Sequence, residues 1–155
     1  MTDRVKARLY VGAQIALLAA LVLWPRGTSW ATPLWLLIPA EIALATGLAV
    51  VLASGWQLGR ALTPSPVPTA AGTLRTHGLY GWVRHPIYSG LMLMAAGLAA
   101  ASRDWLHVGL WAALVVLLTF KARWEERLLR RRYPSYPAYE RHTPRFLPRL
   151  GGRRP

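Results

Sequence analysis

The densest group of reactive side chains is the stretch HGLYGWVRHPIYSG at residues 77–90. Fourteen positions hold two histidines, an arginine and two tyrosines. A second such group, WEERLLRRRYPSYPAYERHTPRFLP at residues 124–148, holds paired glutamates followed by arginines and tyrosines. Carboxylates and aromatic rings attract cations, and arginine grips carboxylates with two hydrogen bonds. Together the segments predict a binding site for a charged ligand.

The first segment predicts a loop followed by a helix. The residue before a proline is pushed out of helical geometry, and proline suits the first helical turn. Arg84 and His85 are therefore expected on the loop, and a helix should begin at about Pro86. Its free amides and positive dipole end would favour an anionic group. Tyr88 and Gly90 fall in the first turn or so, and Gly90 permits close approach of a backbone or a ligand.

The second segment begins with two adjacent carboxylates. Side chains of neighbouring residues point about 100° apart on a helix, so at most one glutamate should face a given pocket squarely. Glu126 has Arg130 four residues on, which is the favourable orientation for an ion pair. Glu125 is therefore the preferred free ligand. Because prolines punctuate the chain after Tyr133, we expect an irregular tail there that folds back over the site as a lid.

The composition indicates that the two reactive segments are connected by helices that lie in a lipid bilayer. Hydrophobic residues make up 54% of the chain and charged residues 16%, against about 25% charged in a soluble domain. Four apolar stretches occur, at residues 9–24, 34–53, 87–101 and 105–120. Most are shorter than the ~20 residues that cross a bilayer core, so their helices should continue into the flanks, the last one through residues 121–132. The predicted fold is an all-α integral membrane protein with about four transmembrane helices, a cytoplasmic C-terminal helix extension and a lid-like tail.

Length and loop charges predict one membrane domain, residues 1–155, with both termini cytoplasmic. It would comprise two spans (9–53), a cytoplasmic loop (54–86), a helical hairpin (87–120) and a cytoplasmic tail (121–155) that closes a cofactor site. Basic residues are dense before the first span and in the tail but sparse in the two short connections, as the positive-inside rule requires. The net charge of +13 therefore indicates contact with anionic lipid headgroups rather than nucleic acid. The Pro-rich segment 61–73 is expected to be an extended linker.

Other polar residues give weaker signals. The absence of cysteine excludes disulfides and thiolate ligands. The four histidines have no metal-binding spacing, so no metal site is predicted, and His107 is expected at the opposite interface. Glu41 lies inside an apolar stretch, and two interpretations of it remain open. It is either a buried carboxylate with a function or a hydrated carboxylate near the outer interface.

The order of these residues resembles a known family. The run THGLYGWVRHPIYSG, a helical hairpin, EERLL and then YPAYERHTPRFLP resemble the catalytic half of the isoprenylcysteine carboxyl methyltransferases, whose superfamily includes phospholipid methyltransferases. The resemblance covers residues 73–150. It implies methyl transfer from S-adenosylmethionine at the cytoplasmic face to a lipid-like or prenylated substrate that enters from the bilayer, with a carboxylate as a candidate methylated group.

The resemblance also implies a set of site residues. Related tails often have an arginine two residues before the first proline of the P-R-F-x-P segment, where this chain has His142. Catalytic roles are therefore expected of Glu125 and of the flanking Arg141 and Arg145. The residues expected to bind the cofactor are Tyr80, Arg84, His85, Pro86, Tyr88, Gly90, Glu125, Glu126, Tyr139 and His142.

Two alternatives remain open. Membrane NADPH-dependent reductases of the sterol-reductase type have a similar C-terminal half, although they are usually longer and have more spans. A non-catalytic membrane scaffold that keeps the pocket shape would bind no cofactor at all.

Overall fold

The chain is helical throughout the part that the structure describes. The computed structural model describes residues 2–31, 33–59 and 74–149. These residues form helices and connecting turns and no strand, which confirms the all-helical prediction. The predicted linker at residues 61–73 lies outside the described residues. The elements are α1 (Asp3–Leu23), α2 (Leu34–Leu58), the 3-10 turn η2 (Gly78–Gly81), α3 (Pro86–Ser102), α4 (Trp105–Arg132) and α5 (Tyr136–His142).

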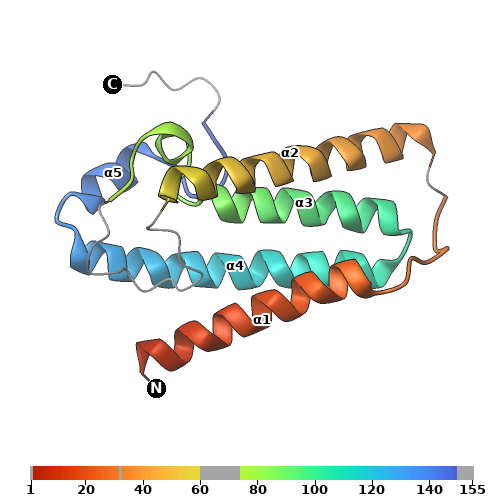
Figure 1. The fold of residues 1–155 in the computed structure, drawn as a ribbon, viewed down its shortest axis with the longest axis horizontal. Helices are drawn as coiled ribbons and strands as arrows, with labels where there is room; N and C mark the ends of the chain where they lie inside the picture. The colour runs from red at the N-terminus through yellow and green to blue at the C-terminus, as the bar shows by residue number, and fades with distance from the viewer. Residues whose placement is uncertain (1, 32, 60–73, 150–155) are drawn as a thin grey trace.

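Four long helices run back and forth, with α3 between α2 and α4 and with α1 against α4 (Figure 1). The beginnings of α1 and α3 lie at the same end of the bundle as the ends of α2 and α4. Helix α5 lies there too, so we name this end the α5 end. The alternation brings the two chemically dense segments together, although the α3–α4 hairpin separates them in the sequence.

The long helices have the dimensions of membrane spans. Helices α1, α2 and α4 contain 21, 25 and 28 residues, and each includes a strongly apolar window. That is enough to cross a bilayer core, which needs about 20 residues. Helix α3 is apolar but shorter, at 17 residues. Three of the described helices are therefore long and apolar enough to cross a membrane, and a fourth span remains a prediction.

Helix boundaries follow local signals. Helix α3 begins at Pro86 and α4 runs unbroken to Arg132, both as predicted. At the other end of α4, the Asp104 carboxylate accepts a hydrogen bond from the Leu106 amide at 3.2 Å and caps the helix. Helix α2 extends past the predicted residue 53 to Leu58. This extension carries Gln57, whose side-chain oxygen accepts a hydrogen bond from the amide of Leu79 in η2 at 3.0 Å and so holds the 77–90 stretch.

Glycines bring α2 and α3 into close contact. A side chain at Gly90 would lie 2.8 Å from the carbonyl oxygen of Gly47, and one at Gly47 would meet Met94. Helices in membranes often pack through small residues of this kind, because the backbones can then approach. The close approach predicted at Gly90 is thus made by the backbone of α2. Its predicted contact with a cofactor remains a prediction.

Gly97→Ala should destabilise the fold, because the new methyl group would meet the Ala40 carbonyl oxygen and lie 2.8 Å from the Leu44 amide. Overpacking of this kind costs about 1–3 kcal/mol. Gly109→Ala is the matched control, since nothing lies within 4 Å of that position. Thermal unfolding in detergent should show a lower midpoint for the Gly97 variant alone. Equal midpoints would contradict the packing described here.

Candidate functional site

The centre of the α5 end is the buried carboxylate of Glu126, whose side chain is only 1% exposed. Arg145 donates two hydrogen bonds to it, from Nε at 2.8 Å and from Nη2 at 2.7 Å. Arg84 Nη2 lies 3.0 Å from Glu126 Oε1, and His85 Nε2 lies 3.3 Å from the same oxygen. A buried charge is tolerated when it is paired and hydrogen-bonded in this way. Glu126 therefore ties the loop before α3 and the C-terminal tail to α4.

Arg84 extends this cluster to α5. Its Nη1 lies 3.0 Å from Glu140 Oε1 and donates to the Glu140 carbonyl oxygen at 3.2 Å. Glu140 also accepts two hydrogen bonds from Arg130 of α4, at 2.8 and 2.6 Å. Arg130 thus pairs mainly with Glu140, because its distance to Glu126, the partner favoured by sequence spacing, is 3.9 Å. The result is an ion-pair network that joins α4, α5 and the 84–85 loop.

The tail after α5 returns to the start of α3. The amides of Arg84 and His85 donate to the carbonyl oxygens of Pro144 and Arg145, at 2.9 and 3.1 Å. The Ser89 hydroxyl donates to the Phe146 carbonyl oxygen at 2.7 Å. Residues 144–146 therefore lie along the beginning of α3. Their action as a lid over a ligand stays a prediction.

His85 lies between the two glutamates. Its ring stacks on Tyr88, with centroids 5.2 Å apart and planes 2° from parallel. Its Nδ1 lies 3.7 Å from Glu125 Oε2, and that oxygen accepts a hydrogen bond from the Tyr88 hydroxyl at 2.9 Å. Each imidazole nitrogen of His85 thus lies near one of the two carboxylates, and the expectation that at most one glutamate faces a ligand pocket stays a prediction.

The two glutamates nevertheless differ in accessibility. The Glu125 side chain is 25% exposed, whereas that of Glu126 is 1% exposed. Glu126 is paired with two arginines, while Glu125 accepts from the neutral Tyr88 hydroxyl. The geometry thus agrees with the preference for Glu125 as the carboxylate that a ligand can reach.

Three tyrosines line the same region. The Tyr139 hydroxyl donates to the Tyr80 carbonyl oxygen, and the ring of Tyr136 meets that of Tyr139 edge-on at 5.8 Å. Within the described part of the chain, the hydroxyls of Tyr80 and Tyr136 are buried without a hydrogen-bond partner. Burial, then the nearby charge of Glu125, raises the pKa of Tyr80 well above its ordinary value, and burial raises the pKa of Tyr139 to about 12. These hydroxyls remain protonated at neutral pH, and those of Tyr80 and Tyr136 are available as donors.

The structure brings most of the predicted site residues to the α5 end. The group at or beside the ion-pair network contains Tyr80, Arg84, His85, Pro86, Tyr88, Glu125, Glu126, Tyr139 and Arg145. It does not bring Arg141 and His142 into that group, because α5 turns Tyr136 and Glu140 inward and leaves these two residues exposed. Their predicted roles remain predictions.

Sequence reasoning missed α5 and its inward residues. The prolines after Tyr133 predicted irregular chain, but Pro137 occupies the first turn of a helix that begins at Tyr136. Proline is well suited to that position, since its missing N–H has no helical partner there in any case. The signal was the order Ser-Tyr-Pro at residues 135–137, a cap position followed by an early proline. Recognition of this pattern would have predicted a helix with Tyr136 and Glu140, four residues apart, on its inner face.

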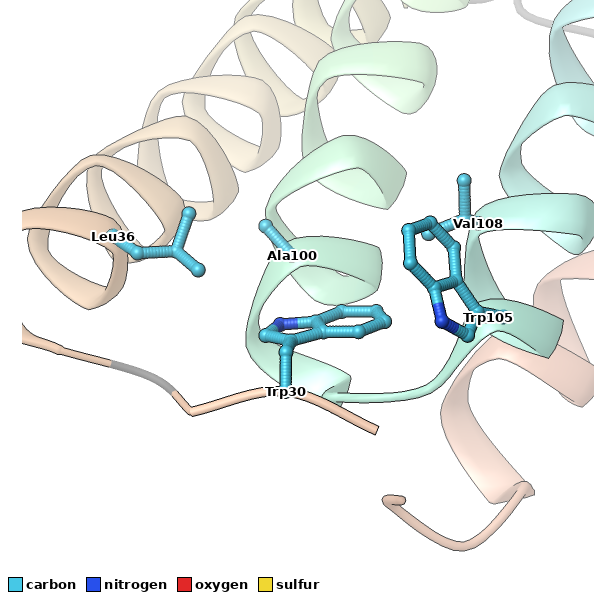
Figure 2. A pocket seen from close by; sticks show the side chains of 5 residues that line it. All are labelled: Trp30, Leu36, Ala100, Trp105 and Val108. Carbon is cyan, nitrogen blue, oxygen red and sulfur yellow. The ribbon is translucent and has the colours of Figure 1, made fainter. Parts of the chain in front are cut away.

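The other polar residues lie elsewhere. Glu41 is exposed on α2, away from the α5 end. His107 lies near the start of α4, at the end of the bundle opposite α5, and is buried there at 2% exposed, with its Nδ1 3.5 Å from Asp104 Oδ2; its predicted place at a membrane interface remains a prediction. That end also holds an apolar pocket of about 240 Å³, lined by Trp30, Leu36, Ala100, Trp105 and Val108 (Figure 2). Its lining offers no carboxylate or basic group.

Metal ligands do not gather in the described ranges. Residues 2–31, 33–59 and 74–149 contain no group of three or more His, Asp or Glu side chains that could hold a metal ion.

Comparison with known proteins assigns the family. Residues 35–135 match the phospholipid methyltransferase family, which is well over half of the chain. The chain belongs to this family. No solved structure matches it.

Two curated relatives are similar over part of their length. The cobalt-zinc-cadmium resistance protein CzcN of Cupriavidus metallidurans is 40% identical over 80 residues. The nickel-cobalt-cadmium resistance protein NccN of Alcaligenes xylosoxydans xylosoxydans is 37% identical over 79 residues. Each match covers 50% of this chain and 37% of the relative, so the chain corresponds to well under half the length of either protein.

Glu126→Gln should destabilise the protein far more than Glu125→Gln. The first change leaves the buried guanidinium of Arg84 and the partly exposed guanidinium of Arg145 without their shared counter-charge, and breaking a buried pair costs about 3–5 kcal/mol. The second replaces the charged acceptor of the Tyr88 hydrogen bond with a neutral one, which costs about 1 kcal/mol or less. Chemical unfolding in detergent measures both free energies of unfolding. Similar losses for the two variants would contradict the assignment of Glu126 as the structural carboxylate.

Glu140 should contribute a pH-dependent share of the stability. Hydrogen bonds from Arg130, reinforced by the charge of Arg84, lower the pKa of Glu140 below its ordinary value of 4.5 despite partial burial. A carboxyl whose pKa is lower in the folded state stabilises the fold above its unfolded pKa, and this share is lost as the pH falls. The unfolding midpoint of the natural protein should exceed that of Glu140→Gln at pH 7. The gap should narrow progressively below about pH 4.5, and a gap independent of pH would refute the mechanism.

Proposed function

We propose that the chain is an integral membrane methyltransferase that uses S-adenosylmethionine and acts on a lipid-like or prenylated acceptor at the cytoplasmic face. The family assignment supports methyl transfer. The observation that carries the site is the meeting of the 84–90 segment with Glu125, Glu126 and the C-terminal tail at one end of the bundle. The resemblance to isoprenylcysteine carboxyl methyltransferases supports a carboxylate as the methylated group.

The residues at the α5 end fit this cofactor. S-Adenosylmethionine carries a sulfonium, an ammonium, a carboxylate, ribose hydroxyls and an aromatic base. Glu125 offers a partly exposed carboxylate to the cationic groups. The buried, unpartnered hydroxyls of Tyr80 and Tyr136 offer donors to oxygens of the ligand. The stacked rings of His85 and Tyr88 offer an aromatic face to a cation or to the base.

Methyl transfer requires alignment of the methyl donor with the acceptor and exclusion of water. When bound, S-adenosylmethionine would supply an electrophilic methyl group for displacement by a nucleophilic atom of the acceptor. The displacement is in line and depends on geometry more than on acid–base catalysis. The network of Glu126 with Arg84 and Arg145 supports the rigidity this requires. The tail at residues 144–146 covers the start of α3 and would exclude water.

Arg145 has a positioning role in this proposal. Its guanidinium is occupied by Glu126 through two hydrogen bonds. It would therefore hold the buried glutamate and the tail rather than grip the acceptor. Arg141 and His142 are exposed on α5, from where they could reach a ligand only at the surface of the site.

The distribution of charge supports the membrane orientation. The basic residues of the first turns of α1, the end of α4, and α5 with its tail lie at the α5 end. The opposite connections hold Arg26 and Arg103, the latter beside Asp104. By the positive-inside rule the α5 end faces the cytoplasm, with α3 as the fourth span and with basic side chains against anionic headgroups. The acceptor would then enter laterally from the bilayer.

Calorimetric titration with S-adenosylhomocysteine tests the cofactor assignment. The natural protein should bind this product, and Glu125→Gln should weaken binding about tenfold or more, the effect expected from the loss of a charged hydrogen-bond partner. Asp3→Asn, which makes the same chemical change at an exposed position, should leave binding unchanged.

NADPH is titrated in parallel. Binding of NADPH without S-adenosylhomocysteine would replace this proposal with a reductase of the sterol-reductase type. Binding of neither compound by folded protein would favour a non-catalytic scaffold.

A further inference from the structure

An apolar pocket lies at the end of the bundle opposite α5, between the start of α2, the end of α3 and the start of α4 (Figure 2). Its volume is about 240 Å³, and it is lined by Trp30, Leu36, Ala100, Trp105 and Val108. Pockets for whole small molecules usually measure about 300 to 1,000 Å³, so this one has room for part of one extended apolar chain. A rise of about 30 Å along α4 separates Trp105 from Glu125, so the pocket is distinct from the candidate site.

Two tryptophans frame this pocket. The rings of Trp30 and Trp105 meet edge-on, with centroids 5.0 Å apart, and Trp105 is 70% exposed. Tryptophan is enriched where the hydrocarbon of a membrane meets its headgroups. In the proposed orientation, this end of the bundle lies at the interface of the leaflet opposite the α5 end. An apolar pocket at this level is adjacent to the acyl chains of that leaflet.

Arg103 lies beside the pocket in an unusual backbone conformation. It follows α3 with φ 60° and ψ 30°, in the left-handed region where glycine commonly ends a helix. A side chain costs free energy in this region, so the surrounding contacts must hold it there. The Ser29 amide donates to the Arg103 carbonyl oxygen at 2.8 Å, and Arg103 Nε donates to the Trp30 carbonyl oxygen at 2.9 Å. These bonds hold the guanidinium next to a residue that lines the pocket.

The terminal nitrogens of this guanidinium can reach a ligand. The Arg103 side chain is partly exposed, and within the described part of the chain its Nη1 and Nη2 make no hydrogen bond or ion pair. The neighbouring Asp104 carboxylate is used elsewhere, because it accepts from the Leu106 amide at 3.2 Å and lies 3.5 Å from His107 Nδ1. A cation beside an apolar pocket is complementary to a phosphate that is joined to an acyl chain.

We propose that the pocket binds a phospholipid of the leaflet opposite α5, with part of one acyl chain between Trp30 and Trp105 and the phosphate on Arg103. Guanidinium binds phosphate through two parallel, charge-assisted hydrogen bonds. The apolar lining removes the chain from water and adds the hydrophobic contribution. The bound lipid would contact α2, α3 and α4 together. This inference uses the proposed membrane orientation to name the leaflet, and it does not depend on methyl transfer.

Photolabelling of the full chain in detergent tests the site. Phosphatidylglycerol and diacylglycerol, each with the same photoactivatable acyl chain, are titrated, and labelled residues are identified by peptide mass spectrometry. This readout separates lipid at the pocket from lipid at the α5 end. Phosphatidylglycerol should label the pocket lining at a concentration about tenfold lower than diacylglycerol, the effect of a charged hydrogen bond. Glycerol 3-phosphate has the phosphate but no chain, and it should not compete.

Two pairs of variants assign the binding to the two parts of the site. Arg103→Gln should abolish the preference for phosphatidylglycerol, whereas Arg26→Gln, the same change at an exposed position of the same end, should keep it. Ala100→Leu should reduce labelling by both lipids, because the larger side chain fills part of the pocket. Ala113→Leu, the same change at an exposed position of α4, should leave labelling unchanged. If Arg103→Gln does not fold, the Ala100 and Ala113 variants still test the pocket.

Several outcomes would overturn this site. Equal labelling by the two lipids, or a preference that persists in Arg103→Gln, would show that Arg103 does not bind the phosphate. An equal loss in Arg26→Gln would assign the preference to the general basic charge of this end. Labelling undiminished in Ala100→Leu, or competition by glycerol 3-phosphate as strong as by unlabelled phosphatidylglycerol, would exclude the pocket. Binding of S-adenosylhomocysteine is a separate measurement, so its failure would refute the methyltransferase and leave the lipid site intact.

Discussion

The α5 end depends on the neutralisation of one buried carboxylate. Glu126 lies on α4, and isolated burial of its charge would cost several kcal/mol. The compensating arginines come from two other segments, Arg84 from the loop before α3 and Arg145 from the tail. The charge can be compensated only when all three segments are in place. The ion pairs that stabilise the buried Glu126 carboxylate therefore also fix the relative positions of α4, the loop before α3 and the tail.

The two adjacent glutamates have different surroundings in this arrangement. Their side chains leave α4 about 100° apart, so burial of one does not bury the other. Glu126 meets the arginines, while Glu125 faces Tyr88 and His85 and keeps a quarter of its side chain exposed. A neutral donor such as the Tyr88 hydroxyl would compete less with a cationic ligand for Glu125 than a bound arginine would.

Local signals in the sequence predicted the helices well and the tertiary pairs poorly. Apolar runs and Pro86 placed the long helices and the start of α3. The pairing of Arg84 with Glu140 joins residues 56 positions apart, and no local pattern specifies it. Helix α5 was missed for a different reason. A proline interrupts a helix when it lies in the interior, but it is favourable in the first turn, and the sequence alone did not show which position Pro137 occupies. Spacing also favoured an ion pair of Glu126 with Arg130, which is present but long, at 3.9 Å, because Glu140 binds Arg130 more closely, at 2.6 Å.

Polar groups continue from the site into the apolar bundle along a single line. The line runs through contacts of Glu125 with Tyr88, of Tyr88 with Lys121, and of Lys121 with Gln14 on α1. Burial of an ammonium costs free energy in a hydrophobic bundle, and the hydrogen bond to Gln14 and the face of the Tyr88 ring offset part of that cost. Tyr88 contacts both Glu125 and Lys121, and it therefore joins the candidate site to the interior of the bundle.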